Sequence, residues 1–127
     1  MTELSLLAIA IGGGLGSIVR FVISREMGNW LGNYLPYGTL TVNVAGSLAL
    51  GWFITFFFDR PELSSALRLG LTVGFLGAFT TFSTFSLDAV DLILKNRLSD
   101  AFIYIFASVI LAIGFLFLGI QVVKLLT

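Results

Sequence analysis

The residues best suited to contact an ion lie in one polar string, Gly74–Ser86, inside a long apolar run. On a helix, Phe82 and Phe85 share one face, and Thr81 and Thr84 run along an adjoining face. The edge of an aromatic ring is partly positive, so ring edges beside hydroxyl donors can replace part of the water around a small anion. Such a site binds weakly, which suits conduction. The alternative is that the Phe stripe serves helix packing alone.

Four more polar side chains lie within apolar runs. Asn43 lies in a run without charge, where an unpaired amide is costly, so it contacts an ion or forms an interhelical hydrogen bond. Arg20 is the deepest positive charge, and it either extends to the membrane interface or lies in an aqueous vestibule that attracts anions. Tyr104 and Ser108, four residues apart, offer hydroxyls to the same pathway or to a neighbouring helix.

Gly77 and the Thr and Ser residues that follow it predict a break in the third apolar helix. An interrupted helix frees carbonyl groups, which must be buried in protein or satisfied by a ligand. Carbonyl oxygens suit a hard cation such as Na⁺. Thr hydroxyls or water molecules are the alternative partners.

The composition indicates a membrane protein, because 57% of the 127 residues are apolar and only 11% are charged. A typical soluble domain carries about 25% charged residues. The absence of Cys and His excludes disulfides, thiolate and imidazole catalysis, and the usual zinc sites, so we do not expect an enzyme. Seven Lys and Arg balance seven Asp and Glu, and such a balance does not indicate a nucleic-acid partner.

Apolar runs of roughly 20 residues or more predict an all-α fold of four transmembrane helices in a single domain. Between the first two runs, residues 24–36 have the composition of an interfacial loop. The first run lacks a basic leader, so we expect it to be retained as a span. The predicted spans are 4–23, 37–58, 66–94 and 101–123.

Small residues recur at intervals of four in the first and third spans. This spacing lets helix backbones approach closely, so it predicts a tightly packed bundle. The residues are Ala8, Gly12 and Gly16 in the first span, and Gly70, Gly74 and Ala78 in the third.

Positive charge is almost equal on the two sides of the predicted bundle. An excess of Lys and Arg marks the cytoplasmic side, and here the difference is a single residue, so the chain can insert in both orientations. A dimer of two oppositely oriented copies would then resemble an inverted-repeat transporter. The terminal side holds Arg60, Arg68 and Lys124, and the other side holds Arg20, Arg25, Lys95 and Arg97.

Three motifs in this order resemble the Fluc or CrcB family of small bacterial fluoride channels. They are Gly12–Phe21, Pro36–Gly46 and Gly74–Ser86, and the resemblance covers nearly the whole chain. The sequence departs from the family pattern at Ala78, where a second glycine is common, and at Asp88, where glutamate is usual.

The resemblance implies a dual-topology antiparallel homodimer in the bacterial inner membrane, with two pathways that passively export fluoride and relieve its toxicity. It also implies a broken third helix and one structural Na⁺ at the dimer centre. It assigns Phe82, Phe85, Asn43, Ser83, Thr84, Tyr104 and Ser108 to the fluoride pathway, Arg20 to the vestibule, and the carbonyls of Gly77 and Thr80 to Na⁺.

The main alternative is a dual-topology, proton-coupled exporter similar to the small multidrug resistance proteins. Such an exporter needs a membrane-buried carboxylate, and the first two spans have none beyond Glu3. Asp88 and Asp91, toward the end of the third span, are the candidates that remain. A membrane subunit without transport activity is a second alternative, which leaves the polar string unexplained.

Overall fold

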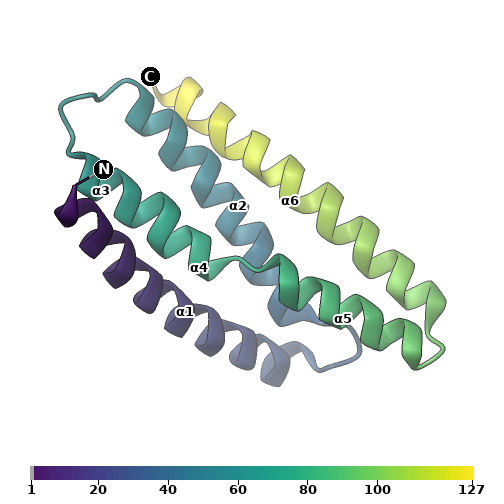
Figure 1. Cartoon of the computed structure of the whole chain (residues 1–127). Helices are drawn as coiled ribbons and strands as arrows, with labels where there is room; N and C mark the ends of the chain where they lie inside the picture. The colour runs from purple at the N-terminus through teal and green to yellow at the C-terminus, as the bar shows by residue number, and fades with distance from the viewer. Residues whose placement is uncertain (1) are drawn as a thin grey trace.

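The computed structural model describes residues 2–127, and within this range the secondary structure is entirely helical. Four helical stretches are long and apolar enough to cross a membrane, which confirms the predicted all-α membrane fold with four spans. They are α1 (Glu3–Leu31), α2 (Tyr37–Phe58), the composite stretch Ser65–Leu94, and α6 (Leu98–Leu126). The start of α1 and the end of α6 lie at the same end of the bundle (Figure 1).

The composite stretch consists of several elements, because its hydrogen-bonding pattern changes along its length. A π-helical segment, η1, lies in its first half. Residues 80 and 81 are extended, with φ and ψ of −92° and 158° at Thr80 and −154° and 115° at Thr81. The elements are α3 (Ser65–Leu69), η1 (Gly70–Leu76), α4 (Gly77–Phe79) and α5 (Phe82–Leu94).

The composite stretch has different neighbours on the two sides of these extended residues. Before them, α3, η1 and α4 pack along α1, and after them α5 packs against α6. The other closely packed pair is α2 and α6, and α2 also contacts α1. The extended residues therefore lie where the composite stretch passes from its contact with α1 to its contact with α6 (Figure 1).

The prediction of an interfacial loop over residues 24–36 is wrong in its first half, because α1 continues to Leu31. A single glycine costs a helix only about 1 kcal/mol, so Gly28 does not end α1. The helix ends at Gly32, whose φ of 87° lies in the left-handed region that glycine adopts readily. As a result, α1 extends well beyond the predicted boundary at residue 23.

Glycines set the close approach of the helices, as the repeats of small residues predict. A Cβ atom at Gly12 would overlap the carbonyl oxygen of Gly70, and one at Gly16 would overlap that of Phe75. Between α2 and α6, a Cβ atom at Gly51 or Gly119 would likewise overlap a carbonyl oxygen of the other helix. Backbones are in direct contact at these points, so larger side chains would force the helices apart.

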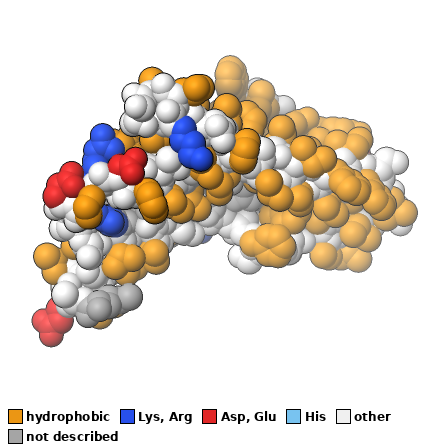
Figure 2. Space-filling view, turned by 90° about the horizontal axis from the view of Figure 1, so that it is seen from above, with side chains coloured by type: hydrophobic (Ala, Val, Ile, Leu, Met, Phe, Trp, Pro, Cys, Tyr) orange, Lys and Arg blue, Asp and Glu red, His pale blue; other side chains and the backbone are white. Residues whose placement is uncertain are grey.

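Apolar side chains cover most of the visible surface, and charged side chains gather at one end of it (Figure 2). Many large apolar side chains are more than half exposed, for example Ile18, Phe102 and Ile113. A chain with this surface is suited to lipid rather than to water.

Candidate functional site

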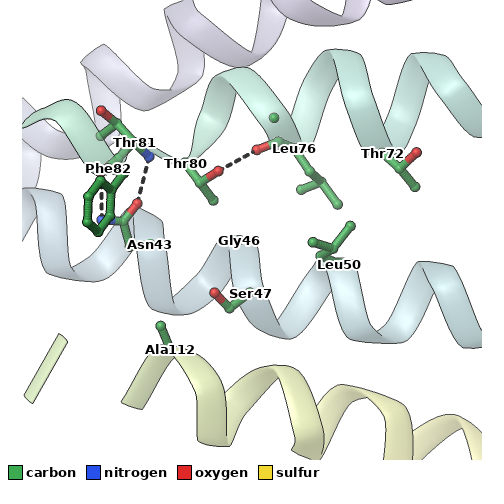
Figure 3. A pocket seen from close by; sticks show the side chains of 11 residues that line it. Asn43, Gly46, Ser47, Leu50, Thr72, Leu76, Thr80, Thr81, Phe82 and Ala112 are labelled. Carbon is green, nitrogen blue, oxygen red and sulfur yellow. Dashed lines mark hydrogen bonds between the residues drawn. The ribbon is translucent and has the colours of Figure 1, made fainter. Parts of the chain in front are cut away.

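The amide of Asn43, on α2, is hydrogen-bonded to the backbone of Thr81. Its Nδ2 donates to the Thr81 carbonyl oxygen at 3.0 Å, and its Oδ1 accepts from the Thr81 N–H at 2.7 Å (Figure 3). The backbone of Thr81 is not helical. The Asn43 side chain therefore supplies the hydrogen-bond partners that a helix would have given to the Thr81 N–H and carbonyl groups. The asparagine thus forms the interhelical hydrogen bond that the sequence left as one of two alternatives.

Two carbonyl groups beside the extended residues lose their ordinary helical donors. The Thr81 N–H, the usual partner of the Gly77 carbonyl, donates to Asn43 instead. The Thr84 N–H, the usual partner of the Thr80 carbonyl, donates to the Thr81 hydroxyl at 3.1 Å. The geometry at both positions therefore leaves carbonyl oxygens available for another partner.

Arg20 contacts the same region from the opposite side. Its Nε donates to the Ala78 carbonyl oxygen at 2.9 Å, and the side chain is half-buried. This contact fixes the guanidinium beside the end of α4. Two side chains from two different helices, Arg20 on α1 and Asn43 on α2, thus hold the backbone on either side of Thr80.

A pocket of about 260 Å³ opens between α2 and the composite stretch. Asn43, Gly77, Thr80 and Phe82 are the predicted site residues that line it, and Figure 3 shows the side chains of Asn43, Thr80 and Phe82 around the opening. Ser47 and Thr72 also line it and were not predicted. Their signal in the sequence was a hydroxyl side chain within one helical turn or so of a predicted site residue, since Ser47 is four residues from Asn43 and Thr72 is five from Gly77.

Three aromatic rings form a row that starts at the pocket. The rings of Phe82 and Phe85 have centroids 5.5 Å apart, and those of Phe85 and Tyr104 have centroids 5.3 Å apart. Phe82 is 77% exposed, whereas Phe85 is 8% exposed and Tyr104 is 1% exposed. The Tyr104 hydroxyl at the buried end donates to the Asp88 carboxylate at 3.0 Å. The row therefore runs from an open surface into the core.

The other predicted hydroxyl residues differ in burial and in hydrogen bonding. Ser83 is exposed, with its Oγ 3.3 Å from the Thr81 hydroxyl, and Thr84 is half-buried. Ser108 is buried on α6, and its Oγ has no hydrogen-bond partner among residues 2–127. A buried hydroxyl without a partner is costly, so Ser108 has an unmet capacity to bind a polar group.

Both candidate carboxylates of the composite stretch have protein partners. Asp88 accepts the hydrogen bond from Tyr104, and Asp91 pairs with Lys95 at 2.8 Å on the exposed surface. Nearby, Arg97 binds Asp100 at 2.8 Å, and this hydrogen bond raises the pKa of the Arg97 guanidinium. Neither Asp88 nor Asp91 is therefore a free carboxylate buried in the centre of a span.

These features define a small multi-pass membrane protein of four helical spans, with freed carbonyls, hydroxyls and aromatic rings that extend from its surface into its core. The family model described as CrcB-like protein, Camphor Resistance (CrcB), matches residues 7–120, and the chain belongs to this family.

Three relatives that match this chain over more than nine tenths of their own length are named fluoride-specific ion channel FluC. The relative from Nitrobacter winogradskyi is 46% identical, over 95% of this chain and 96% of its own. The relative from Rhodospirillum centenum is 41% identical over 94% of both chains, and that from a Synechococcus strain is 38% identical over 93% and 91%.

Proposed function

We propose that this protein is a channel, not an enzyme, that passively exports fluoride from the bacterial cytoplasm and so relieves fluoride toxicity. The observation that carries this proposal is the 46% identity, over nearly full length, to a protein named as a fluoride-specific ion channel. The row of rings beside hydroxyl and amide donors supports it, because such groups can take the place of an anion's water shell.

The channel is an antiparallel homodimer in the inner membrane. Supporting this, the pocket beside Thr80 is open and holds the polar side chains of Asn43 and Ser47 among its lining, and polar groups within a membrane must be covered by protein or by water. Phe82 is 77% exposed beside it. A second copy against this face would cover both, and the balanced charges of the two ends allow that copy to insert upside down.

Fluoride reaches each of two pathways through a vestibule beside Arg20 and then passes the ring edges of Phe82 and Phe85. Asn43 contributes a donor, because its amide has two N–H groups and the bond to Thr81 uses one. Hydroxyl groups line the rest of the pathway, and they belong to Ser83, Thr84, Tyr104 and Ser108.

A structural Na⁺ binds at the centre of the dimer, at the break of the third helix. The residues fit such an ion, because the Gly77 and Thr80 carbonyls have lost their helical donors to Asn43 and Thr81. Carbonyl oxygens are ligands that suit Na⁺, and two copies of the chain would supply four of them. The ion would hold the two breaks together.

The test is efflux from liposomes that contain the purified protein, measured with a fluoride electrode and, in parallel, a chloride electrode, without a pH gradient. We expect fluoride loss without chloride loss. Fluoride retention by folded, dimeric protein would refute the proposal. In that case a proton gradient and a cationic substrate, applied to wild type, Asp88→Asn and Asp91→Asn, would test the exporter alternative.

A further inference from the structure

A stacked ladder of side chains extends from the end of α2 toward the centre of the bundle. The Arg60 guanidinium lies over the Phe56 ring at 3.9 Å, and the Phe56 ring stacks on Trp52 with centroids 4.9 Å apart and planes 13° from parallel. The Arg60 Nη1 donates to the Phe56 carbonyl oxygen at 3.1 Å. These contacts fix the guanidinium above the aromatic pair and leave most of its five N–H donors unused.

Trp52 is also part of the wall of an apolar groove between α2 and α6. The groove has a volume of about 430 Å³, and all the side chains around it are apolar. They are Ala45, Leu48, Ala49, Trp52, Phe53, Leu118 and Val122. The stacked side chains therefore connect the positive charge of Arg60, at the end of α2, to the apolar groove between α2 and α6.

This groove lies on a different side of α2 from the pocket that contains Asn43. Gly46 lines the pocket and Leu48 lines the groove, and two residues on a helix differ by about 200° in direction. The pocket has polar groups among its lining, such as Asn43 and Thr80, that must be covered by protein or water, whereas the lining of the groove is entirely apolar and hydrocarbon satisfies it. The groove is therefore suited to a lipid chain.

The charge at the top of the ladder is not neutralised by the protein. Within the described residues, Arg60 has no carboxylate within 4 Å, although Asp59 and Glu62 are its near neighbours. A second guanidinium, that of Arg68, donates to the Arg60 carbonyl and also lacks an ion pair in this part of the chain. Two unpaired cations at the end of a span attract phosphate at the membrane surface.

We propose that an anionic phospholipid binds this site, with its phosphate on the Arg60 guanidinium and one acyl chain in the groove. Arginine matches phosphate with parallel N–H donors, and stacking on Phe56 orients these donors before the lipid arrives. The groove adds apolar contact below the phosphate. Since this site shares no lining residue with the pocket, its occupancy does not depend on the proposed ion pathway.

The test is native mass spectrometry of the detergent-purified protein with added phosphatidylglycerol, counting retained lipid. We expect Arg60→Gln to lower the affinity for the lipid about fivefold. This factor corresponds to the free energy of attraction between one basic side chain and anionic lipid at the membrane surface. Ala45→Phe, which fills the groove and leaves the charge, should also lower retention. The matched control is Arg25→Gln, because Arg25 also lies near a phenylalanine ring but pairs with Glu26 at 3.4 Å, and it should leave retention unchanged.

Several results would overturn the assignment. Equal retention by Arg60→Gln and Arg25→Gln would remove the phosphate contact from Arg60. Full competition by inorganic phosphate would indicate a site for free anions, not for a lipid. Dissociation of the dimer by Ala45→Phe would show that the groove holds a second copy of the chain. Size-exclusion profiles identify any variant that fails to fold, and the two lipid-site variants test the proposal separately.

Discussion

Replacing Asn43 by alanine tests whether this amide holds the backbone between α4 and α5. The change removes two interhelical hydrogen bonds, of 3.0 Å and 2.7 Å, and leaves the Thr81 N–H and carbonyl without their partner. Interhelical hydrogen bonds in membranes contribute about 0.6–1.7 kcal/mol each. We therefore expect Asn43→Ala to lower the free energy of unfolding by about 1–3 kcal/mol.

The assay is reversible unfolding in mixed micelles with increasing denaturing detergent, followed by circular dichroism. Asn29→Ala is the matched control, because Asn29 is an exposed asparagine within a helix, and its unfolding midpoint should equal that of wild type. Because Asn43 also positions the freed carbonyls, Asn43→Ala should reduce fluoride flux even where the protein remains folded. An unfolding midpoint equal to that of Asn29→Ala, together with normal flux, would refute the reasoning.

Three further perturbations have distinct expected results. Phe82→Ile and Phe85→Ile should each abolish fluoride efflux while the dimer remains assembled. Phe85→Ile, at a ring that is buried within a single chain, should also cost about 1 kcal/mol of stability. Normal flux through either variant would contradict the role of the rings. Gly16→Ala should destabilise the protein by about 1–3 kcal/mol, because the new methyl overlaps the Phe75 carbonyl. Gly14→Ala meets no atom within 4 Å and should be neutral or stabilising by up to about 1 kcal/mol, the helix preference of alanine over glycine. Equal melting temperatures of the two variants would contradict the packing of α1 on η1. Replacing Na⁺ by a large organic cation on both sides of the membrane should lower the melting temperature and the fluoride efflux together, and no change in either would contradict the carbonyl site for Na⁺.

The sequence predicted the four spans because each is a long run of apolar residues, and composition alone determines that lipid must surround them. It also predicted the close helix contacts, since Gly12 and Gly16 repeat at the helical interval. The contact of each with Gly70 or Phe75 on the composite stretch was beyond sequence reasoning. Spacing identifies the face of a helix but not the partner that meets it.

The sequence could not predict the hydrogen bonds at the centre of the site, because they join residues that are far apart in the chain. Asn43 and Thr81 are 38 positions apart, and Arg20 and Ala78 are 58 positions apart. Only the packing of α1 and α2 against the composite stretch brings these atoms together. The end of α1 was misplaced for a local reason, since residues 24–31 have the composition of a loop but the geometry of a helix.

The most direct test of the central proposal is fluoride efflux from liposomes at zero pH gradient, with chloride efflux as the internal control. Fluoride loss without chloride loss, abolished by Phe82→Ile in a dimer that still assembles, is the expected result. Fluoride retention by wild-type protein that is folded and dimeric, or equal loss of both anions, would contradict the proposal that this chain is a fluoride-selective channel.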